Sequence, residues 1–227
     1  MDITLYYREK GDKDPFILLH GNGEDGTYFK YQIEYFSDRY RMFALDTRGH
    51  GKSKRGDAPF TIKQFAKDLN VFMDNLGIER AIILGFSDGA NIAMEFVLKY
   101  PHKVKALILN AGNLNPKGVK RTIQIPIELG YKIATGFSSK SQWAKKNAEM
   151  FGLMVNEPNM EPSELAKISV PTLVVCGTRD MIKEAHTREI AKNIPNAKLA
   201  IVKGNHFIAN KNHKIFNQEV EDFLQTI

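Results

Sequence analysis

The chain has 227 residues, 43% of them hydrophobic and 26% charged, which is ordinary for one soluble globular domain with a large core. Its single cysteine, Cys176, excludes an internal disulfide framework and is consistent with a reducing compartment, so we expect a cytoplasmic protein. We expect no signal peptide, because the N-terminus has no basic region followed by an apolar stretch. We expect no membrane partner, because no apolar run is long enough to span a bilayer. The net charge is +6, but the lysines are scattered, which favours a solvated surface over a nucleic-acid site.

The first half of the chain alternates between apolar runs typical of strands and amphipathic stretches typical of helices. We predict strands at 3–8, 16–19, 41–45, 81–84 and 104–109. We predict helices at 27–36, 61–76 and 90–100. The clearest helix is 61–76, where apolar residues recur at helical spacing and Gly77 follows the last of them.

Between residues 113 and 167 the strand pattern disappears. We expect short helical pieces there, broken by Pro116, Pro126, Pro158 and Pro162. The segment 113–167 is too short to hold a core of its own. We therefore predict that it is a helical cap inserted between two parts of one core, 1–112 and 168–227. Its aromatic and methionine residues either line an apolar acyl or alcohol pocket or pack the insertion onto the core. They are Tyr131, Phe137, Trp143, Met150, Phe151 and Met154.

The alternation resumes after the insertion, with strands predicted at 170–176 and 198–202 and helices at 183–193 and 214–225. Alternating elements of this kind predict an α/β fold, a mostly parallel sheet of about seven strands with helices on both faces. Ligands of such sheets bind at the carboxyl ends of the strands. The unusual polar clusters all fall there, at 20–23, 46–53, Ser87, Asp180 and His206.

Gly85, Ser87 and Gly89 form a Gly-x-Ser-x-Gly motif between a predicted strand and a predicted helix. A sharp turn at that place needs small residues on either side of the serine and exposes its hydroxyl at the positive end of the helix. Glycine and serine also mark ordinary turns, but the flanking strand and helix favour a nucleophile elbow.

A serine nucleophile needs a base, and the base needs a carboxylate that orients it. His206 is the histidine that follows a strand at the correct edge in a short glycine-containing loop, and Asp180 ends the preceding strand at the same edge. The loop after Leu109 offers no acid, so Asp180 is preferred to that position. The order serine, aspartate, histidine along the chain is the one expected for this arrangement.

The oxyanion of the tetrahedral intermediate needs two N–H donors, for which we predict the backbone of Asn22 and Asp88. We interpret Asp46, Arg48 and His50 as structural, hydrogen-bonding the backbone near the site. No ligand spacing supports a metal site, and we expect neither a metal nor a cofactor.

These motifs together resemble the α/β-hydrolase superfamily over nearly the whole chain. His20-Gly21-Asn22-Gly23 is similar to its oxyanion loop, and residues 46–53 are similar to its Asp-x-Arg-Gly-x-Gly-x-Ser loop. The resemblance implies that Ser87, Asp180 and His206 occupy the triad positions and that residues 113–167 occupy the position of the cap. One departure is the short N-terminus, with one strand before Phe16 where the family usually has two.

The sequence therefore predicts a serine hydrolase that cleaves a carboxylic ester or related acyl bond of a small substrate. The Ser-Asp-Gly elbow resembles that of biphenyl-hydrolase-like, valacyclovirase-type hydrolases, which implies a substrate ammonium on Asp88; otherwise Asp88 is simply an acid at a helix start. We take Phe86, Asp88, Trp143 and Phe207 as candidate substrate-binding residues. C–C bond hydrolysis or lyase chemistry, perhydrolysis and a non-catalytic binding role stay open, and we expect a monomer or a homodimer.

Overall fold

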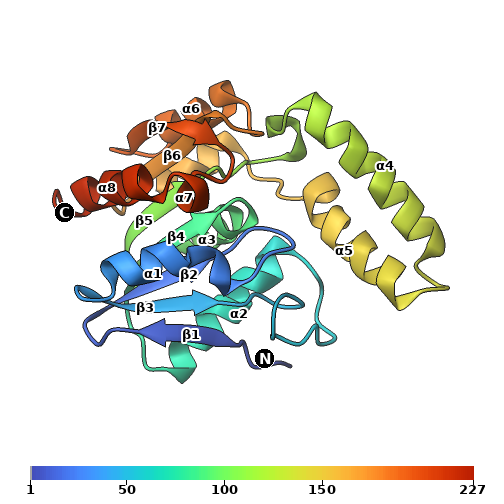
Figure 1. Cartoon of the computed structure of the whole chain (residues 1–227), viewed down its shortest axis with the longest axis horizontal. Helices are drawn as coiled ribbons and strands as arrows, with labels where there is room; N and C mark the ends of the chain where they lie inside the picture. The colour runs from blue at the N-terminus through green and yellow to red at the C-terminus, as the bar shows by residue number, and fades with distance from the viewer. Residues whose placement is uncertain (1) are drawn as a thin grey trace.

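A seven-stranded sheet forms the centre of the structure, a computed structural model that describes residues 2–227 (Figure 1). Its strands lie in the order β1-β3-β2-β4-β5-β6-β7, and only β1 runs antiparallel to its neighbour. This confirms the predicted mostly parallel α/β sheet. The strands are β1 (Tyr7–Lys10), β2 (Asp14–Leu19), β3 (Tyr40–Leu45), β4 (Ala81–Phe86), β5 (Val104–Asn110), β6 (Thr172–Arg179) and β7 (Lys198–Asn205).

Helices cover both faces of the sheet because the central strands are apolar on both sides. Phe16 and Leu18 of β2 point into one core, while Ile17 and Leu19 point into the other. The first core is covered by α1 (Lys30–Phe36), α7 (Ile208–Lys211) and α8 (His213–Leu224). The second core is covered by α2 (Ile62–Asn75), α3 (Asp88–Lys99) and α6 (Glu184–Asn193).

Most predicted elements are confirmed to within a few residues. The helix predicted over 61–76 is α2, which begins where the Thr61 hydroxyl accepts a hydrogen bond from the backbone of Gln64 at 3.1 Å. Short 3₁₀ turns occur at Gly26–Phe29, Pro101–Lys103, Pro116–Gly118 and Pro162–Lys167.

The strand predicted over 3–8 is wrong for residues 3–6, because β1 begins only at Tyr7. The Tyr6 N–H donates to the Ser53 hydroxyl at 2.8 Å, and the Tyr6 carbonyl accepts from the Asp46 N–H at 2.9 Å. The chain there pairs with the loop after β3 instead of with a strand. A β-rich sequence does not distinguish these two kinds of partner.

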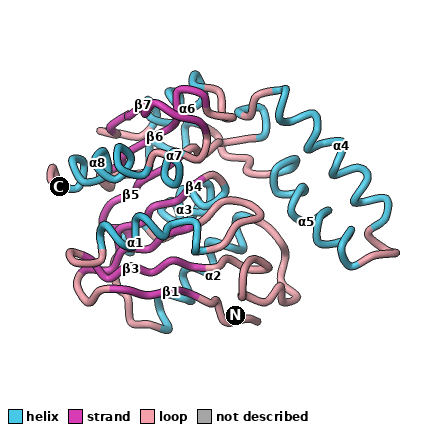
Figure 2. Tube along the Cα trace, viewed as in Figure 1, coloured by secondary structure: helices cyan, strands magenta, loops and turns pink. Residues whose placement is uncertain are grey.

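The segment between β5 and β6 folds as a helical hairpin of α4 (Arg121–Phe137) and α5 (Gln142–Asn156), which stands out from one side of the sheet (Figures 1 and 2). The predicted break at Pro126 is wrong, since α4 passes through it. Proline removes the hydrogen bond to the carbonyl of Thr122, but both residues are exposed, so water can satisfy that carbonyl. Among the described residues, none of the helices combines the length and apolar character needed to cross a membrane.

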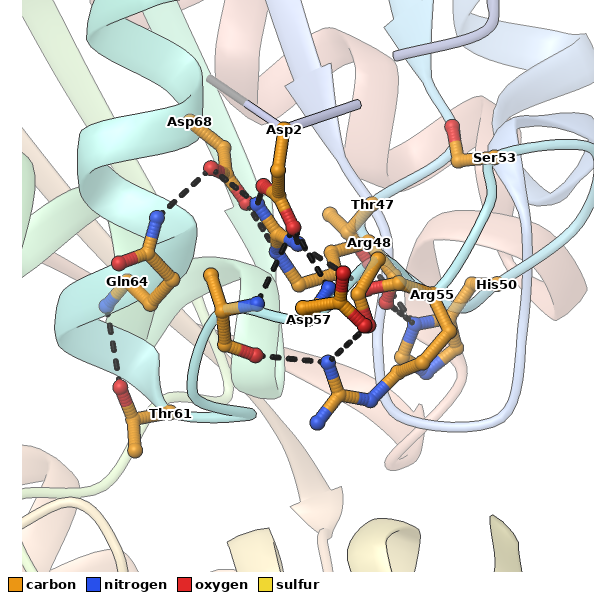
Figure 3. Close-up of polar contacts among 12 residues, drawn as sticks. Asp2, Thr47, Arg48, His50, Ser53, Arg55, Asp57, Thr61, Gln64 and Asp68 are labelled. Carbon is orange, nitrogen blue, oxygen red and sulfur yellow. Dashed lines mark hydrogen bonds and ion pairs between the residues drawn. The ribbon is translucent and has the colours of Figure 1, made fainter. Parts of the chain in front are cut away.

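The loop after β3 is held by the fully buried side chain of Arg48 (Figure 3). Its guanidinium donates to both carboxylate oxygens of Asp68 on α2, at 2.7 and 2.8 Å. It also donates to both oxygens of Asp2, at 3.0 and 2.7 Å, and to the Arg55 carbonyl at 3.0 Å. One side chain therefore fastens the N-terminal segment, the loop and α2 together, which agrees with the structural interpretation of Arg48.

Replacing Arg48 with alanine is expected to lower the free energy of unfolding by about 3–5 kcal/mol, because the buried Asp68 carboxylate is left without its partner. Urea unfolding followed by circular dichroism measures this. The control is Arg41→Ala, which removes a partly exposed ion pair with Glu9 and is expected to cost about 1 kcal/mol or less. Equal losses in the two variants would contradict the role assigned to burial.

Candidate active site

The turn between β4 and α3 places Ser87 in a strained conformation. Its φ is 54° and its ψ is −119°, a region that residues other than glycine rarely adopt. A Cβ atom on Gly85 would lie 2.2 Å from the Gly89 carbonyl oxygen, and one on Gly89 would lie 1.9 Å from that of Leu19. Both flanking positions therefore require glycine, which is the physical content of the Gly-x-Ser-x-Gly motif.

Ser87, His206 and Asp180 lie within hydrogen-bonding distance of one another in series. His206 Nε2 is 3.1 Å from Ser87 Oγ, and His206 Nδ1 is 2.6 Å from Asp180 Oδ1. His206 follows β7, and Asp180 follows β6. The two loops approach closely because Gly177 has no side chain: a Cβ there would lie 2.3 Å from the Asn205 carbonyl oxygen. The structure thus brings together the three residues proposed from the sequence.

The Asp180 carboxylate is oriented by several donors. Its Oδ1 accepts from the Ile182 N–H at 3.0 Å, and its Oδ2 accepts from the Gly177 N–H at 3.2 Å. Burial alone would raise the pKa of Asp180, but the hydrogen bond and charge of His206 and the two N–H groups together lower it. The carboxylate is therefore ionised and faces His206 Nδ1.

The two predicted oxyanion donors lie at the same edge of the sheet. Asp88 is the first residue of α3, so its N–H has no partner within the helix. Within residues 2–227, the N–H groups of Asn22 and Asp88 donate to no protein acceptor. Both are therefore available to a ligand. The side chain of Asn22 has a further contact that the sequence did not indicate, since its Nδ2 donates to the Met150 carbonyl on α5 at 2.7 Å.

The Asp88 side chain is buried beside Ser87. Its Oδ1 accepts from Asn91 Nδ2 at 3.2 Å, and Asn91 is held in turn by Asn113. No group among the described residues donates to Asp88 Oδ2. Burial raises the pKa of Asp88 to about 6, although the amides of Asn22 and Asn91 act in the opposite direction. The polar network around Asp88 was missed from the sequence, because it joins α3 to a loop 22 residues further along.

The aromatic candidates divide into two groups. Phe86 is buried, stacked on Tyr28 with ring centroids 4.4 Å apart and packed 4.9 Å from the His206 ring. Phe207 lies 5.4 Å from the same imidazole. These two rings fix the position of His206. Trp143 lies apart from them on α5, with 74% of its side chain exposed.

A groove of about 450 Å³ separates the loop after β2 from α5. It is lined on one side by Asn22, Glu24 and His50, and on the other by Trp143, Met150, Phe151 and Met154. The insertion therefore presents its methionine and aromatic side chains to the groove. Glu24 was missed from the sequence: burial raises the pKa of its carboxyl to about 7, and its Oε2 has no hydrogen-bond donor among residues 2–227.

His20 and His50 hold the two loops beside the site. His20 Nε2 accepts from the Thr47 N–H at 3.0 Å, and the Thr47 hydroxyl lies 3.1 Å from His50 Nδ1. Burial lowers the pKa of both imidazoles, that of His50 to about 3, so both are neutral at pH 7. Over the described range, 2–227, no cluster of three or more histidine, cysteine, aspartate or glutamate side chains is arranged to hold a metal ion.

Comparison with known proteins identifies related chains. A family model described as alpha/beta hydrolase fold matches residues 14–132. The 3-oxoadipate enol-lactonase 2 of Acinetobacter baylyi is 26% identical and aligns with 99% of this chain and 94% of its own length. The 2-hydroxy-6-oxononadienedioate/2-hydroxy-6-oxononatrienedioate hydrolase 2 of Pseudomonas putida is 28% identical, covering 99% of this chain and 93% of its own. A solved esterase from Thermogutta terrifontis, 22% identical, has the same fold, with a TM-score of 0.82 over 99% of this chain and 94% of that chain.

The raised pKa of Asp88 predicts a pH-dependent stability. The folded chain holds this proton more tightly than the unfolded chain, so stability falls as the pH rises from about 4 to about 6. Asp88→Asn removes the penalty and is expected to raise the free energy of unfolding by about 2–3 kcal/mol at pH 8, with little effect at pH 4. Urea unfolding at the two pH values measures the difference.

The matched control is Asp12→Asn, which replaces an exposed carboxylate by the same amide. If this variant gained as much stability at pH 8 as Asp88→Asn, the gain could not come from burial of Asp88.

Proposed function

The chain belongs to the alpha/beta hydrolase fold family, and from that membership we propose that it is a serine hydrolase that cleaves a carboxylic ester or related acyl bond of a small substrate. The observation that supports this most directly is the continuous contact from Ser87 Oγ through His206 to Asp180, at 3.1 and 2.6 Å. A serine, an imidazole and a carboxylate in that series form the arrangement that activates a hydroxyl for attack on an acyl carbon.

In the proposed mechanism, His206 Nε2 takes the proton of Ser87 as Oγ attacks the acyl carbon. The carbonyl oxygen gains negative charge and receives hydrogen bonds from the backbone N–H groups of Asn22 and Asp88. The protonated imidazole is stabilised by Asp180 and then gives its proton to the leaving alcohol oxygen as the ester bond breaks. Water attacks the resulting acyl-enzyme by the same route, with His206 again acting as base, and releases the acid and Ser87.

These residues need no cofactor for this reaction, and we propose that the substrate is a small molecule. We also propose that the protein is cytoplasmic and is a monomer or a homodimer. The lactonase and esterase similarities favour an ester over other bonds. The Pseudomonas putida relative is named for a substrate with ketone and carboxylate groups and no ester, so C–C hydrolysis is the nearest competing reaction. Perhydrolysis would instead require hydrogen peroxide, and a purely binding protein would not react with a fluorophosphonate.

A rapid-mixing experiment with short p-nitrophenyl esters tests the nucleophile. The wild type is expected to release a burst of about one equivalent of nitrophenol, because acylation of Ser87 precedes hydrolysis of the acyl-enzyme. Ser87→Ala is expected to lose the burst and to lose about 10⁴-fold or more in kcat, since a triad without its nucleophile keeps only oxyanion binding.

The control variant is Ser169→Ala, which removes an exposed hydroxyl just before β6 and is expected to keep the full burst. Turnover by Ser87→Ala at the wild-type rate would refute the assignment of the nucleophile. A Ser87-dependent fluorophosphonate label without ester turnover would move the proposal to C–C bond substrates.

One observation favours a narrower substrate class, the α-amino esters. Asp88 Oδ2 has no donor among the described residues and lies on the residue next to the nucleophile. A substrate ammonium that reached this oxygen would form a charge-assisted hydrogen bond and would hold the carboxyl group in its ionised form.

Under this alternative, Asp88→Asn is expected to reduce kcat/KM for a phenylalanine p-nitrophenyl ester by at least about tenfold more than for the matched 3-phenylpropionate ester, which lacks the amino group. The ratio of the two losses is the measurement. Equal losses on both esters would leave Asp88 as a structural residue of the elbow and return the proposal to neutral esters.

A further inference from the structure

An unusual apolar ridge runs along the outer helix of the hairpin. Ile125, Leu129, Ile133 and Phe137 follow one another at four-residue intervals on α4, and each is more than half exposed. Trp143 on α5 is 74% exposed. Across residues 2–227, nine large hydrophobic side chains are exposed, and these five belong to a hairpin of 36 residues (121–156). Such a concentration of exposed apolar side chains is typical of a surface that binds a protein partner or a membrane.

The ridge is not used to attach the hairpin to the rest of the chain. α4 packs against α5, and α5 packs against the 3₁₀ turn at Pro116–Gly118. The hairpin is attached to the rest of the chain by Leu153 of α5 and Ile123 of α4, which pack against the two cores. It also makes polar contacts, from Arg55 to Glu149 at 2.7 Å and from Asn22 to the Met150 carbonyl. Figures 1 and 2 show α4 on the side of α5 away from the sheet. The side chains of the ridge are exposed to solvent, and Ile133 and Phe137 also border the groove between α4 and α5.

The charge of the hairpin has one predominant sign. Five exposed basic residues lie on it and form no ion pair within residues 2–227: Arg121, Lys132, Lys140, Lys145 and Lys146. Lys145 and Lys146 line the groove between α5 and the loop after β3, so Arg121, Lys132 and Lys140 are the basic residues left for the outer side. The hairpin holds two acidic residues, Glu128 and Glu149, and Glu149 is neutralised by Arg55. A second copy of this chain would bring the same positive surface against itself, so self-association through the ridge is electrostatically unfavourable.

We propose that the α4–α5 hairpin docks on the surface of an anionic lipid bilayer. In this proposal the ridge lies among the acyl chains at the boundary, and Arg121, Lys132 and Lys140 lie at the lipid phosphates. A soluble polyanion would bind the lysines but leave the apolar ridge exposed to water. A neutral apolar partner would cover the ridge but leave the positive charges uncompensated. An anionic bilayer satisfies both. This revises, for one face, the expectation of no membrane partner that the absence of a bilayer-spanning apolar run suggested.

The proposed docking surface is continuous with the candidate active site. An apolar groove of about 370 Å³ between the two helices is lined by Ile133, Phe137 and Trp143. It shares Trp143, Asn147 and Phe151 with the groove that reaches Asn22. Docking would therefore place the open end of that groove beside the lipid surface.

The fluorescence of Trp143 can report on docking directly, because it is the single tryptophan of the chain. The full chain carrying Ser87→Ala is mixed with vesicles of phosphatidylcholine, with and without about a third phosphatidylglycerol, so that lipid hydrolysis does not contribute. We expect Trp143 emission to shift to the blue and the protein to float with the anionic vesicles only, with an affinity that falls as salt is added.

Two double variants, each with a matched control, test the two parts of the surface. Lys132→Glu with Lys140→Glu is expected to weaken binding by about 25-fold or more, since each basic residue contributes about fivefold at an anionic surface. The control, Lys67→Glu with Lys203→Glu, makes the same change of net charge on exposed sites elsewhere and is expected to bind nearly as the parent does.

Leu129→Ser with Phe137→Ser is expected to abolish the blue shift, whereas Ile215→Ser with Ile227→Ser, which removes two equally exposed side chains outside the hairpin, is expected to retain it. Equal losses in test and control variants, or no flotation with anionic vesicles at low salt, would overturn the proposal. A dimer in sedimentation that disappears in the Leu129→Ser, Phe137→Ser variant without any vesicle binding would assign the ridge to a second copy instead.

Discussion

The candidate site depends on one close approach, that of the start of α3 to the end of β2. The Gly89 backbone lies against the Leu19 carbonyl, and a Cβ there would be only 1.9 Å from that oxygen. The backbones at Gly85 and Gly89 are both in close contact with their neighbours, and Ser87 between them adopts the strained backbone conformation that links β4 to α3. The same contact seats the beginning of α3 beside the loop that follows β2, where a Cβ on Gly21 would lie 3.2 Å from Ser87 Cβ. The strain at the serine and the proximity of the two N–H donors therefore have a common cause.

Burial and local contacts give the carboxyl groups near the site different pKa values. The pKa of Asp180 is lowered, because the favourable contacts of His206 and two N–H groups outweigh its burial. The pKa values of Asp88 and Glu24 are raised, to about 6 and about 7, because their burial is not compensated in this way. His20 and His50 are neutral. Near neutral pH Asp180 is ionised and Asp88 is mostly ionised, whereas Glu24 is partly protonated.

Much of the fold and the contacts of the site could be predicted because the signals are local. Strand and helix periodicity identifies the sheet, and Ser87, Asp180 and His206 each follow a strand at an edge that the alternation of elements already defines. The failures involve partners distant in sequence. Residues 3–6 bond to a loop instead of a strand, and the Asn22 side chain reaches α5 across 128 positions. Pro126 stays within a helix because exposure lets water replace the missing hydrogen bond.

In the hairpin, apolar side chains at helical spacing serve two different purposes: some line the groove beside the site, and others are exposed on the surface. A cover that only sheltered the site would bury its apolar face against the core, and the strength of that packing would then hold it in place. Here the hairpin buries only Leu153 of α5 and part of Ile123 of α4 against the cores. It adds the partly exposed pair of Arg55 and Glu149, and such pairs contribute about 1 kcal/mol or less. Met150 and Phe151 of α5 line the groove, while Leu129 and Phe137 of α4 meet solvent. The hairpin therefore has apolar side chains on two sides, one facing the groove and one facing solvent. Repulsion among its lysines disfavours association of two copies through the solvent-facing side.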